Sequence, residues 1–226
     1  MYFKNIKDEK SKSILFIGAH PDDIELSCAG TVCHFIEKKY EIFCYHLTNG
    51  IYSDINGNIV RDFEEILNTS KKSLGILGVR EKNIFFTDVP ATQLKVNKER
   101  ISELQKFIID QNISMVFTHP DPDTYHQDHR AVHNITMASS RRFVHNIFFF
   151  ESVFNFASGL MIPNCYVDIS KYIEKKNESI RFHETEYKKY GGEKAIDSII
   201  SLAKYRGFQV GIDYAEAFNV MRYLLE

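Results

Sequence analysis

Residues 13–18, Ser-Ile-Leu-Phe-Ile-Gly, form a short apolar run that is typical of a buried strand. Apolar residues then recur at helical spacing through Ile24, Cys28, Val32 and Phe35. The same order repeats along the chain. Strands are predicted at 41–47, 83–86 and 114–118, and helices at 61–77 and 98–110. Strands that alternate with helices of this length indicate right-handed crossovers, so the sequence predicts a three-layer α/β fold with a mainly parallel sheet.

The pattern changes in the C-terminal part of the chain. Two further strands are predicted at 148–153 and 165–168, followed by helices at 171–187, 193–204 and 214–225. No linker or repeat separates this part from the rest. We therefore expect one domain over residues 1–226, in which a strand and helix subregion, 147–226, completes the sheet and one wall of a cleft.

Composition places the chain among ordinary globular proteins. It has 226 residues, 44% of them hydrophobic, and a net charge of −2, which argues against a nucleic-acid partner. The sequence predicts no integral membrane segment, because its apolar runs fall short of the ~20 residues that a membrane helix needs. The first twelve residues lack the apolar core of a secretory signal, so a cytoplasmic location is expected. The four cysteines match no zinc or disulfide spacing and are interpreted as buried thiols.

Two polar segments directly follow predicted strands. The first is Gly18-Ala-His-Pro-Asp-Asp-Ile-Glu25, and the second runs from Thr118 to Arg130 and contains His126-Gln-Asp-His129. Ligands of open α/β sheets bind at the carboxyl ends of the strands, where such loops gather. The two segments are therefore expected to meet at one edge of the sheet.

The residue types in these segments suit a catalytic metal. Such a site uses three His, Asp or Glu ligands and leaves a position open for water. His20 and Asp23 lie three residues apart at a strand-to-helix turn, and His126 and His129 have the same spacing at a predicted helix start. All four can face one point, and spacing alone does not choose among them.

Two carboxylates accompany these candidate ligands. Asp22 would lie beside the metal, where it can take a proton from an activated water molecule. Asp128 can accept a hydrogen bond from an imidazole and so fix its tautomer. A simpler interpretation is a set of structural histidines with two aspartates that favour a helix N-terminus. Two such clusters at strand ends favour the metal hydrolase.

These residues resemble the LmbE/PIG-L-like family of zinc-dependent N-deacetylases. That family carries a GAHPDDxE-type motif after its first strand and an HxDH motif after a later one, which stand here as Gly18–Glu25 and His126–His129. The resemblance extends to Gly30-Thr31, to Thr48-Asn-Gly50 and to Tyr214-Ala-Glu-Ala-Phe218, and so spans most of the chain.

The resemblance implies a Rossmann-like sandwich and a role for each motif residue. It implies that zinc is held by His20, Asp23 and His129, that Asp22 is the general base, that His126 polarises the substrate or donates a proton, that Asp128 orients an imidazole, and that Arg61 contacts the substrate. Fe²⁺ or Co²⁺ would suit the same ligands.

Other residues of the chain lie outside these motifs or depart from the family pattern. His183-Glu-Thr-Glu186 only loosely resembles a His-x-Ser-Gln element of the family. His119 is interpreted either as a cleft residue or as a supporting one. Aromatic residues in the loops are candidates for stacking on a sugar, with packing as the simpler role: Tyr52, Tyr125, Phe154 and Phe156.

The resulting hypothesis is a metal-dependent hydrolase that removes an N-acetyl group from an amino sugar or glycoconjugate. An alternative with the same site is an amidase that cleaves a larger acyl amide, as in thiol conjugates. A third alternative, a nucleotide-binding module or scaffold, is disfavoured because GAHPDD lacks the glycines that approach a pyrophosphate. The sequence leaves a homo-oligomer open, because Phe148-Phe149-Phe150 fits either a core or an interface.

Overall fold

The computed structural model describes residues 12–120, 126–152 and 161–225. Its seven strands form one sheet in the order β3-β2-β1-β4-β5-β7-β6. The strands are β1 (Ser13–Gly18), β2 (Glu41–His46), β3 (Ile84–Phe86), β4 (Met115–Thr118), β5 (Asn146–Phe150), β6 (Cys165–Asp168) and β7 (Ala215–Arg222). The helices are α1 (Asp23–Glu37), α2 (Phe63–Leu77), α3 (Lys98–Asp110), α4 (Gln127–Ser140), α5 (Ile173–Arg181), α6 (Glu184–Lys189) and α7 (Glu193–Val210).

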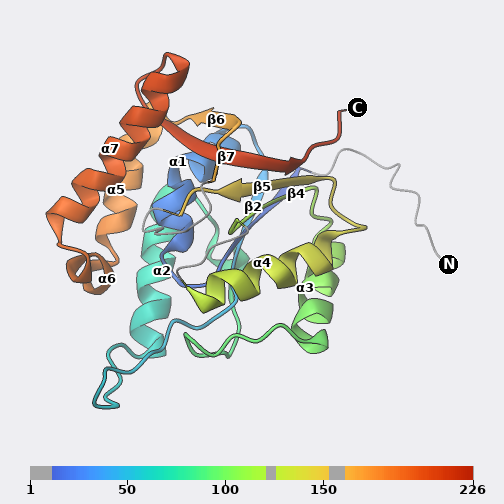
Figure 1. Ribbon diagram of the computed structural model, residues 1–226, viewed down its shortest axis with the longest axis vertical. Helices are drawn as coiled ribbons and strands as arrows, with labels where there is room; N and C mark the ends of the chain where they lie inside the picture. Colours follow the sequence, from blue (N-terminus) through green and yellow to red (C-terminus); the bar gives the residue numbers. More distant parts are fainter. Residues whose placement is uncertain (1–11, 121–125, 153–160, 226) are drawn as a thin grey trace.

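Helices cover both faces of the sheet, which confirms the predicted three-layer sandwich (Figure 1). On one face, Leu15 and Ile17 of β1 pack with Leu104 of α3 and Val132 of α4. On the other face, Phe16 packs with residues of α1 and α2. Successive side chains of β1 therefore point to opposite faces of the sheet, and all four from Ile14 to Ile17 are fully buried.

The sheet is parallel from β3 to β5, whereas β7 runs antiparallel to both of its neighbours. The helix predicted at 214–225 is therefore wrong, because Ala215–Arg222 forms β7 between β5 and β6. The helix predicted at 171–187 is broken, since α5 ends at Arg181 and α6 begins at Glu184. The helix at 98–110 is confirmed at both ends, with Asn97 accepting a hydrogen bond from the backbone of Arg100.

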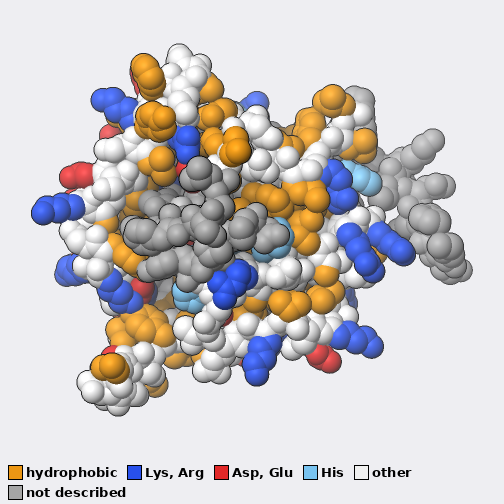
Figure 2. Space-filling view, viewed as in Figure 1, with side chains coloured by type: hydrophobic (Ala, Val, Ile, Leu, Met, Phe, Trp, Pro, Cys, Tyr) orange, Lys and Arg blue, Asp and Glu red, His pale blue; other side chains and the backbone are white. Residues whose placement is uncertain are grey.

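The phenylalanine run and the cysteines can now be placed in the fold. Phe148, Phe149 and Phe150 lie in the core of the chain itself, so this run has no need of a partner to cover it. The four cysteines are free thiols, three of them buried. Among the helices that the structure describes, none is both long and apolar enough to cross a membrane. On the face shown in Figure 2, Lys and Arg side chains are scattered among hydrophobic ones, several of which lie over the C-terminal end of α7.

Candidate metal centre

The strand order places the two polar segments together. From β1 the chain proceeds outward through β2 and β3, whereas β4 and β5 lie on the other side of β1. The junction between β1 and β4 is thus the point where the strand order reverses, which is where open α/β sheets bind ligands. The turn after β1 carries His20, Asp22 and Asp23, and α4, which follows β4, begins beside His126.

The turn after β1 is shaped around the Asp23 carboxylate. Its Oδ2 accepts hydrogen bonds from the backbone N–H groups of Ala19 (2.8 Å) and His20 (2.7 Å). Gly18 leaves room for this arrangement, because a Cβ atom there would lie 3.0 Å from the Cβ of Asp23. His119 is fully buried, and its Nε2 donates to the same Oδ2 at 3.1 Å. The other oxygen, Oδ1, is left facing His129.

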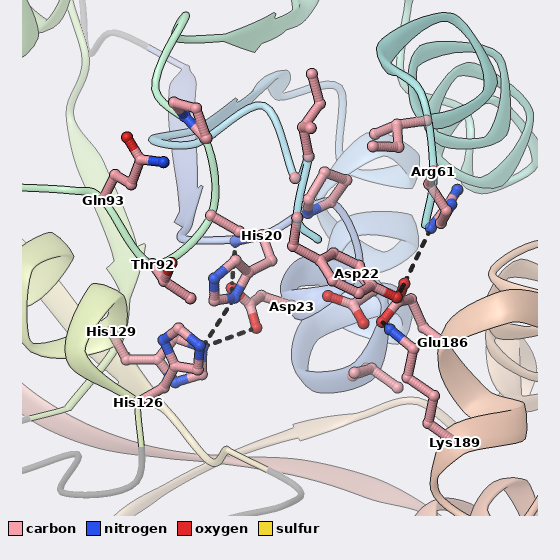
Figure 3. Close-up of a pocket in the computed structure, with 18 of the residues that line it drawn as sticks. His20, Asp22, Asp23, Arg61, Thr92, Gln93, His126, His129, Glu186 and Lys189 are labelled. Atoms are coloured by element: carbon pink, nitrogen blue, oxygen red, sulfur yellow. Dashed lines mark hydrogen bonds and ion pairs between the residues drawn. The ribbon is translucent and has the colours of Figure 1, made fainter. Parts of the chain in front are cut away.

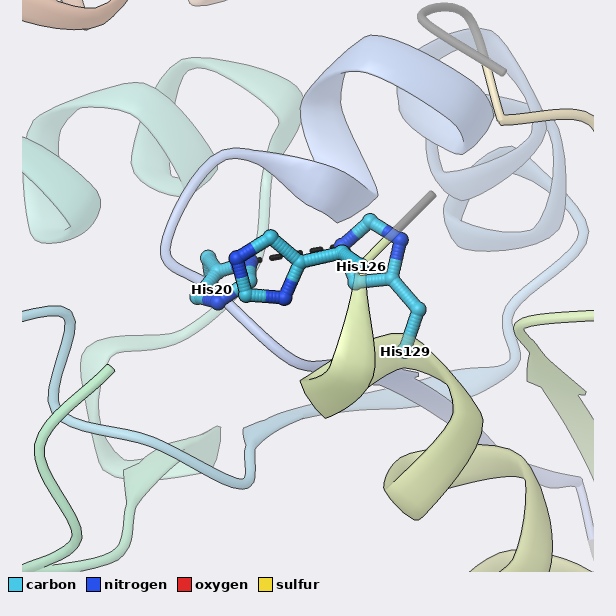
Figure 4. Close-up of side chains that lie close together, drawn as sticks. All are labelled: His20, His126 and His129. Carbon is cyan, nitrogen blue, oxygen red and sulfur yellow. Dashed lines mark hydrogen bonds between the residues drawn. The ribbon is translucent and has the colours of Figure 1, made fainter. Parts of the chain in front are cut away.

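Three donor atoms converge at this point. His20 Nδ1 lies 3.3 Å from His129 Nε2 and 3.7 Å from Asp23 Oδ2, and His129 Nε2 lies 3.4 Å from Asp23 Oδ1 (Figures 3 and 4). His129 belongs to two overlapping groups whose ligand atoms could hold a metal ion, one with His20 and His126 and the other with Asp23 and His119. Ligands of a tetrahedral ion bonded at about 2.0–2.1 Å stand about 3.3 Å apart. The donor set and its spacing therefore fit a small divalent cation.

Hydrogen bonds around the cluster favour His20 over His126 as a ligand. His20 Nε2 donates to Asp128 Oδ2 at 3.0 Å, which leaves the Nδ1 lone pair of His20 free for a metal. His126 Nδ1 instead accepts the backbone N–H of Asp128, so the neutral ring carries its hydrogen on Nε2. In this tautomer His126 is a hydrogen-bond donor toward the site. His119 Nε2 is likewise engaged by Asp23.

Asp128 is held in place by the loop before α3. It is fully buried, and its carboxylate also accepts the backbone N–H groups of Thr92 (2.6 Å) and Leu94 (3.3 Å). Burial would raise the pKa of Asp128, but its hydrogen bonds with His20 and Thr92 outweigh burial and lower that pKa. The group therefore stays ionised beside the imidazole that it orients.

The pKa values of Asp22 and His126 are shifted in opposite directions. Asp22 precedes α1 without capping it, and burial, followed by the charges of Asp23 and Glu186, raises its pKa to about 7. Burial and then the charges of His20 and His129 lower the pKa of His126 to about 4. His126 is thus neutral at neutral pH, whereas Asp22 can bind and release a proton there. A bound cation would lower the pKa of Asp22 from this raised value and that of His126 still further.

The cluster opens into a cavity of about 620 Å³. Figure 3 shows the histidines and Asp23 at one end, the side chains of Arg61, Glu186 and Lys189 at the other, and Asp22 between them. Arg61, 5% exposed, donates from Nε to Glu65 at 3.0 Å and from Nη1 to Glu186 at 3.4 Å.

The aromatic residues predicted to stack on a sugar have different outcomes. Tyr52 lines the cavity, and the ammonium group of Lys189 lies 3.8 Å from the centre of its ring. Tyr125, Phe154 and Phe156 lie outside the described residues.

Known proteins are similar to this chain over much of its length. The PIG-L family, described as GlcNAc-PI de-N-acetylase, matches residues 15–140, more than half of the chain. The chain belongs to the PIG-L family. An Escherichia coli relative named uncharacterized deacetylase YaiS is 38% identical over 138 residues, which cover 58% of this chain and 70% of the relative. The diacetylchitobiose deacetylase of Thermococcus kodakarensis is 28% identical over 227 residues, covering 92% of this chain and 82% of that protein. This PIG-L family protein is accordingly a deacetylase of the LmbE/PIG-L type.

Solved structures support the fold of this PIG-L family protein. The N,N'-diacetylchitobiose deacetylase of Pyrococcus horikoshii superposes with a TM-score of 0.79 at 23% identity, covering 93% of this chain and 84% of that one. GalB, a 4-carboxy-2-hydroxymuconate hydratase from Pseudomonas putida, also reaches 0.79 at 17% identity, covering 95% and 98%. The fold is therefore shared with a protein named for another reaction, so function has to be argued from the site.

Two residues near the cavity were assigned no role from the sequence. One of them, Glu186, lines it, and the other, His183, contacts Glu25 behind it. Glu186 and His183 lie far from both motifs in the sequence, and only the folded chain brings them close to the residues that follow β1. Their sole signal was the loose His-x-Ser-Gln resemblance.

Proposed function

We propose that this protein is a metal-dependent hydrolase that removes the N-acetyl group of an amino sugar. The observation that carries the proposal is the convergence of His20 Nδ1, Asp23 Oδ1 and His129 Nε2 beside a carboxylate, Asp22, that takes no part in capping. The family and the diacetylchitobiose deacetylase named among its relatives point to an acetylated sugar as substrate.

His20, Asp23 and His129 are the residues that would hold the cation, with Zn²⁺ as first choice and Fe²⁺ as an alternative. When bound, such an ion polarises the amide carbonyl and acidifies a water molecule. Asp128 fixes the ring of His20 in the tautomer that binds. Arg61, which lines the cavity, is a candidate for contacts with sugar hydroxyls.

Asp22 is assigned to proton transfer. Its carboxylate lies in the cavity beside the proposed ligands, where it takes a proton from the attacking water and then delivers it to the nitrogen of the leaving amine. His126 donates a hydrogen bond from Nε2 to the oxygen on which negative charge develops. Because His126 is neutral, it acts as a dipole and leaves the proton shuttle to Asp22.

The experiment combines metal analysis with acetate release from N-acetylglucosamine glycosides. We expect about one divalent ion per chain in the wild type and in Asp22→Asn, with turnover at least about 100-fold lower in the variant. Asp197→Asn, on the exposed side of α7, is the matched control and should change neither quantity. Release only from longer acyl amides would favour the amidase alternative, and a protein without metal would contradict the proposal.

A further inference from the structure

Glu186 occupies the end of the cavity farthest from the histidines (Figure 3). Its Oε1 accepts hydrogen bonds from Tyr52 Oη (3.3 Å) and Arg61 Nη1 (3.4 Å), and its Oε2 accepts from Lys189 Nζ (2.9 Å). The Glu186 side chain is 19% exposed. The Glu186 carboxylate therefore lies among the cationic and hydroxyl donors at this end of the cavity, which together form its far wall: Tyr52, Arg61 and Lys189.

The charges of this wall are already balanced. Arg61 and Lys189 contribute two positive charges, and Glu65, which pairs with Arg61, and Glu186 contribute two negative ones. Asp22 lies on the side toward the histidines and adds a further carboxylate. An anionic group of a substrate would meet cations whose charge is already compensated, and a carboxylate that repels it.

We propose that Glu186 determines substrate specificity, so that the enzyme selects uncharged N-acetyl saccharides and discriminates against those bearing phosphate or carboxylate groups. This inference rests on the proposed function. Sugar hydroxyls both donate and accept, so they can bond to Glu186 and Lys189 without displacing either. Discrimination then comes from repulsion of the wrong ligand as much as from contacts with the right one.

The test compares kcat/KM for methyl N-acetyl-β-glucosaminide and N-acetylglucosamine 6-phosphate. The wild type should prefer the neutral substrate by about tenfold or more, and Glu186→Gln should lower that ratio by about tenfold, because it releases Arg61 and Lys189 from their counter-charge. Glu184→Gln is the matched control. It lies on the same helix, is 62% exposed and pairs with Lys188, so the ratio should stay at the wild-type value.

Binding gives a second readout that does not depend on turnover. The two dissociation constants, measured by calorimetry in the Asp22→Asn background with and without Glu186→Gln, should show the same change in ratio. If Glu186→Gln left the ratio unchanged in both measurements, or if the wild type preferred N-acetylglucosamine 6-phosphate, the role of Glu186 in specificity would be overturned. The proposed function would still stand. Acetate release from neither substrate would overturn the proposed function, while calorimetry would still decide the charge preference.

Discussion

At the scale of single residues, the site depends on contacts that orient the cluster. Asp128 contacts no metal in the proposed arrangement, yet its carboxylate fixes the tautomer of His20 and is itself held by two backbone amides. Asp128→Asn keeps the shape but loses the negative charge. We expect zinc affinity to fall by about 10–100-fold.

Competition with a chromophoric chelator measures this affinity. Asp110→Asn, at the exposed end of α3, should retain the wild-type value. Equal affinities in Asp128→Asn and the wild type would show that His20 needs no carboxylate to orient it.

A second residue-scale prediction concerns the buried pair of His183 and Glu25. His183 Nε2 lies 2.9 Å from Glu25 Oε1, and both side chains are almost completely buried. Burial would lower the pKa of His183, but the charge of Glu25 and its hydrogen bond outweigh burial and raise it. Burial would raise the pKa of Glu25, but the charge of His183 and the hydrogen bonds from His183 and Ser73, taken together with the charge of His46, outweigh burial and lower it.

The sign of the pH dependence follows from these two shifts. The stabilisation from His183 is fully present below its ordinary pKa of 6.5 and is lost as pH rises through the raised value. That from Glu25 is present above 4.5 and is lost as pH falls through the lowered value. His183→Gln should therefore cost more free energy of unfolding at pH 5.5 than at pH 8.5, as measured by urea denaturation. A cost independent of pH would mean that the pair is not charged.

At the scale of elements, α1 is joined to the C-terminal part by a buried ion pair. Glu216 of β7 accepts the backbone N–H groups of Gly30 (3.0 Å) and Thr31 (2.7 Å), in the middle of α1. Lys176 of α5 bonds to Glu216 at 2.6 Å and to the carbonyl of Leu26 at 2.7 Å. The pair thus connects two elements, β7 and α5, to α1, the helix that begins at the turn after β1.

Removing one member of this pair leaves the other charge buried without compensation. Lys176→Met should lower the free energy of unfolding by about 3–5 kcal/mol, and adding Glu216→Gln should recover part of that loss. Urea denaturation of the two single variants and the double variant measures the coupling. Lys171→Met is the control, because its pair with Glu37 is exposed and its removal should change stability far less than the loss of the buried pair. Additive effects of the two buried substitutions would rule out the coupling.

The same elements show where sequence reasoning succeeds and where it fails. Helix α3 and strand β1 could be predicted because local signals, an Asn97 cap and a continuous apolar run, agree with the fold. Strand β7 could not be predicted, because Ala215, Ala217 and Met221 favour helices and only pairing with β5 and β6 makes the segment a strand. Likewise, the turn between α5 and α6 lets the ring of His183 reach Glu25, a partner far away in the sequence.

The candidate site was more predictable than the C-terminal fold. Its residues lie in two short segments at the ends of parallel strands, so the sheet itself brings His20 and His129 together. Spacing could not separate His126 from the ligands, since that distinction depends on a backbone amide bonding to its Nδ1. The far wall with Glu186 was out of reach, because it combines the loop before α2 with α6.

At the scale of the whole molecule, the proposed ligands join the two halves of the sheet. His20 and Asp23 follow β1, and His129 lies on α4, which packs on β1 from the other side of the junction between β1 and β4. A cation bound there therefore links segments that separate when the chain unfolds. Metal binding is then coupled to folding, because the ion binds the folded chain and loses its site in the unfolded one.

This coupling predicts a large thermal effect of metal removal. A ligand at about 1,000 times its dissociation constant stabilises the folded state by roughly 4 kcal/mol. For a chain of this length each kcal/mol shifts Tm by about 2–4 °C, so removal of the ion by a chelator should lower Tm by roughly 10 °C. Scanning calorimetry with Zn²⁺, Fe²⁺ and Co²⁺ added back would rank the metals. His129→Ala should lose most of this response, whereas His145→Ala, which leaves all three proposed ligands in place, should keep it. An equal response in His129→Ala and the wild type would place the stabilising ion elsewhere.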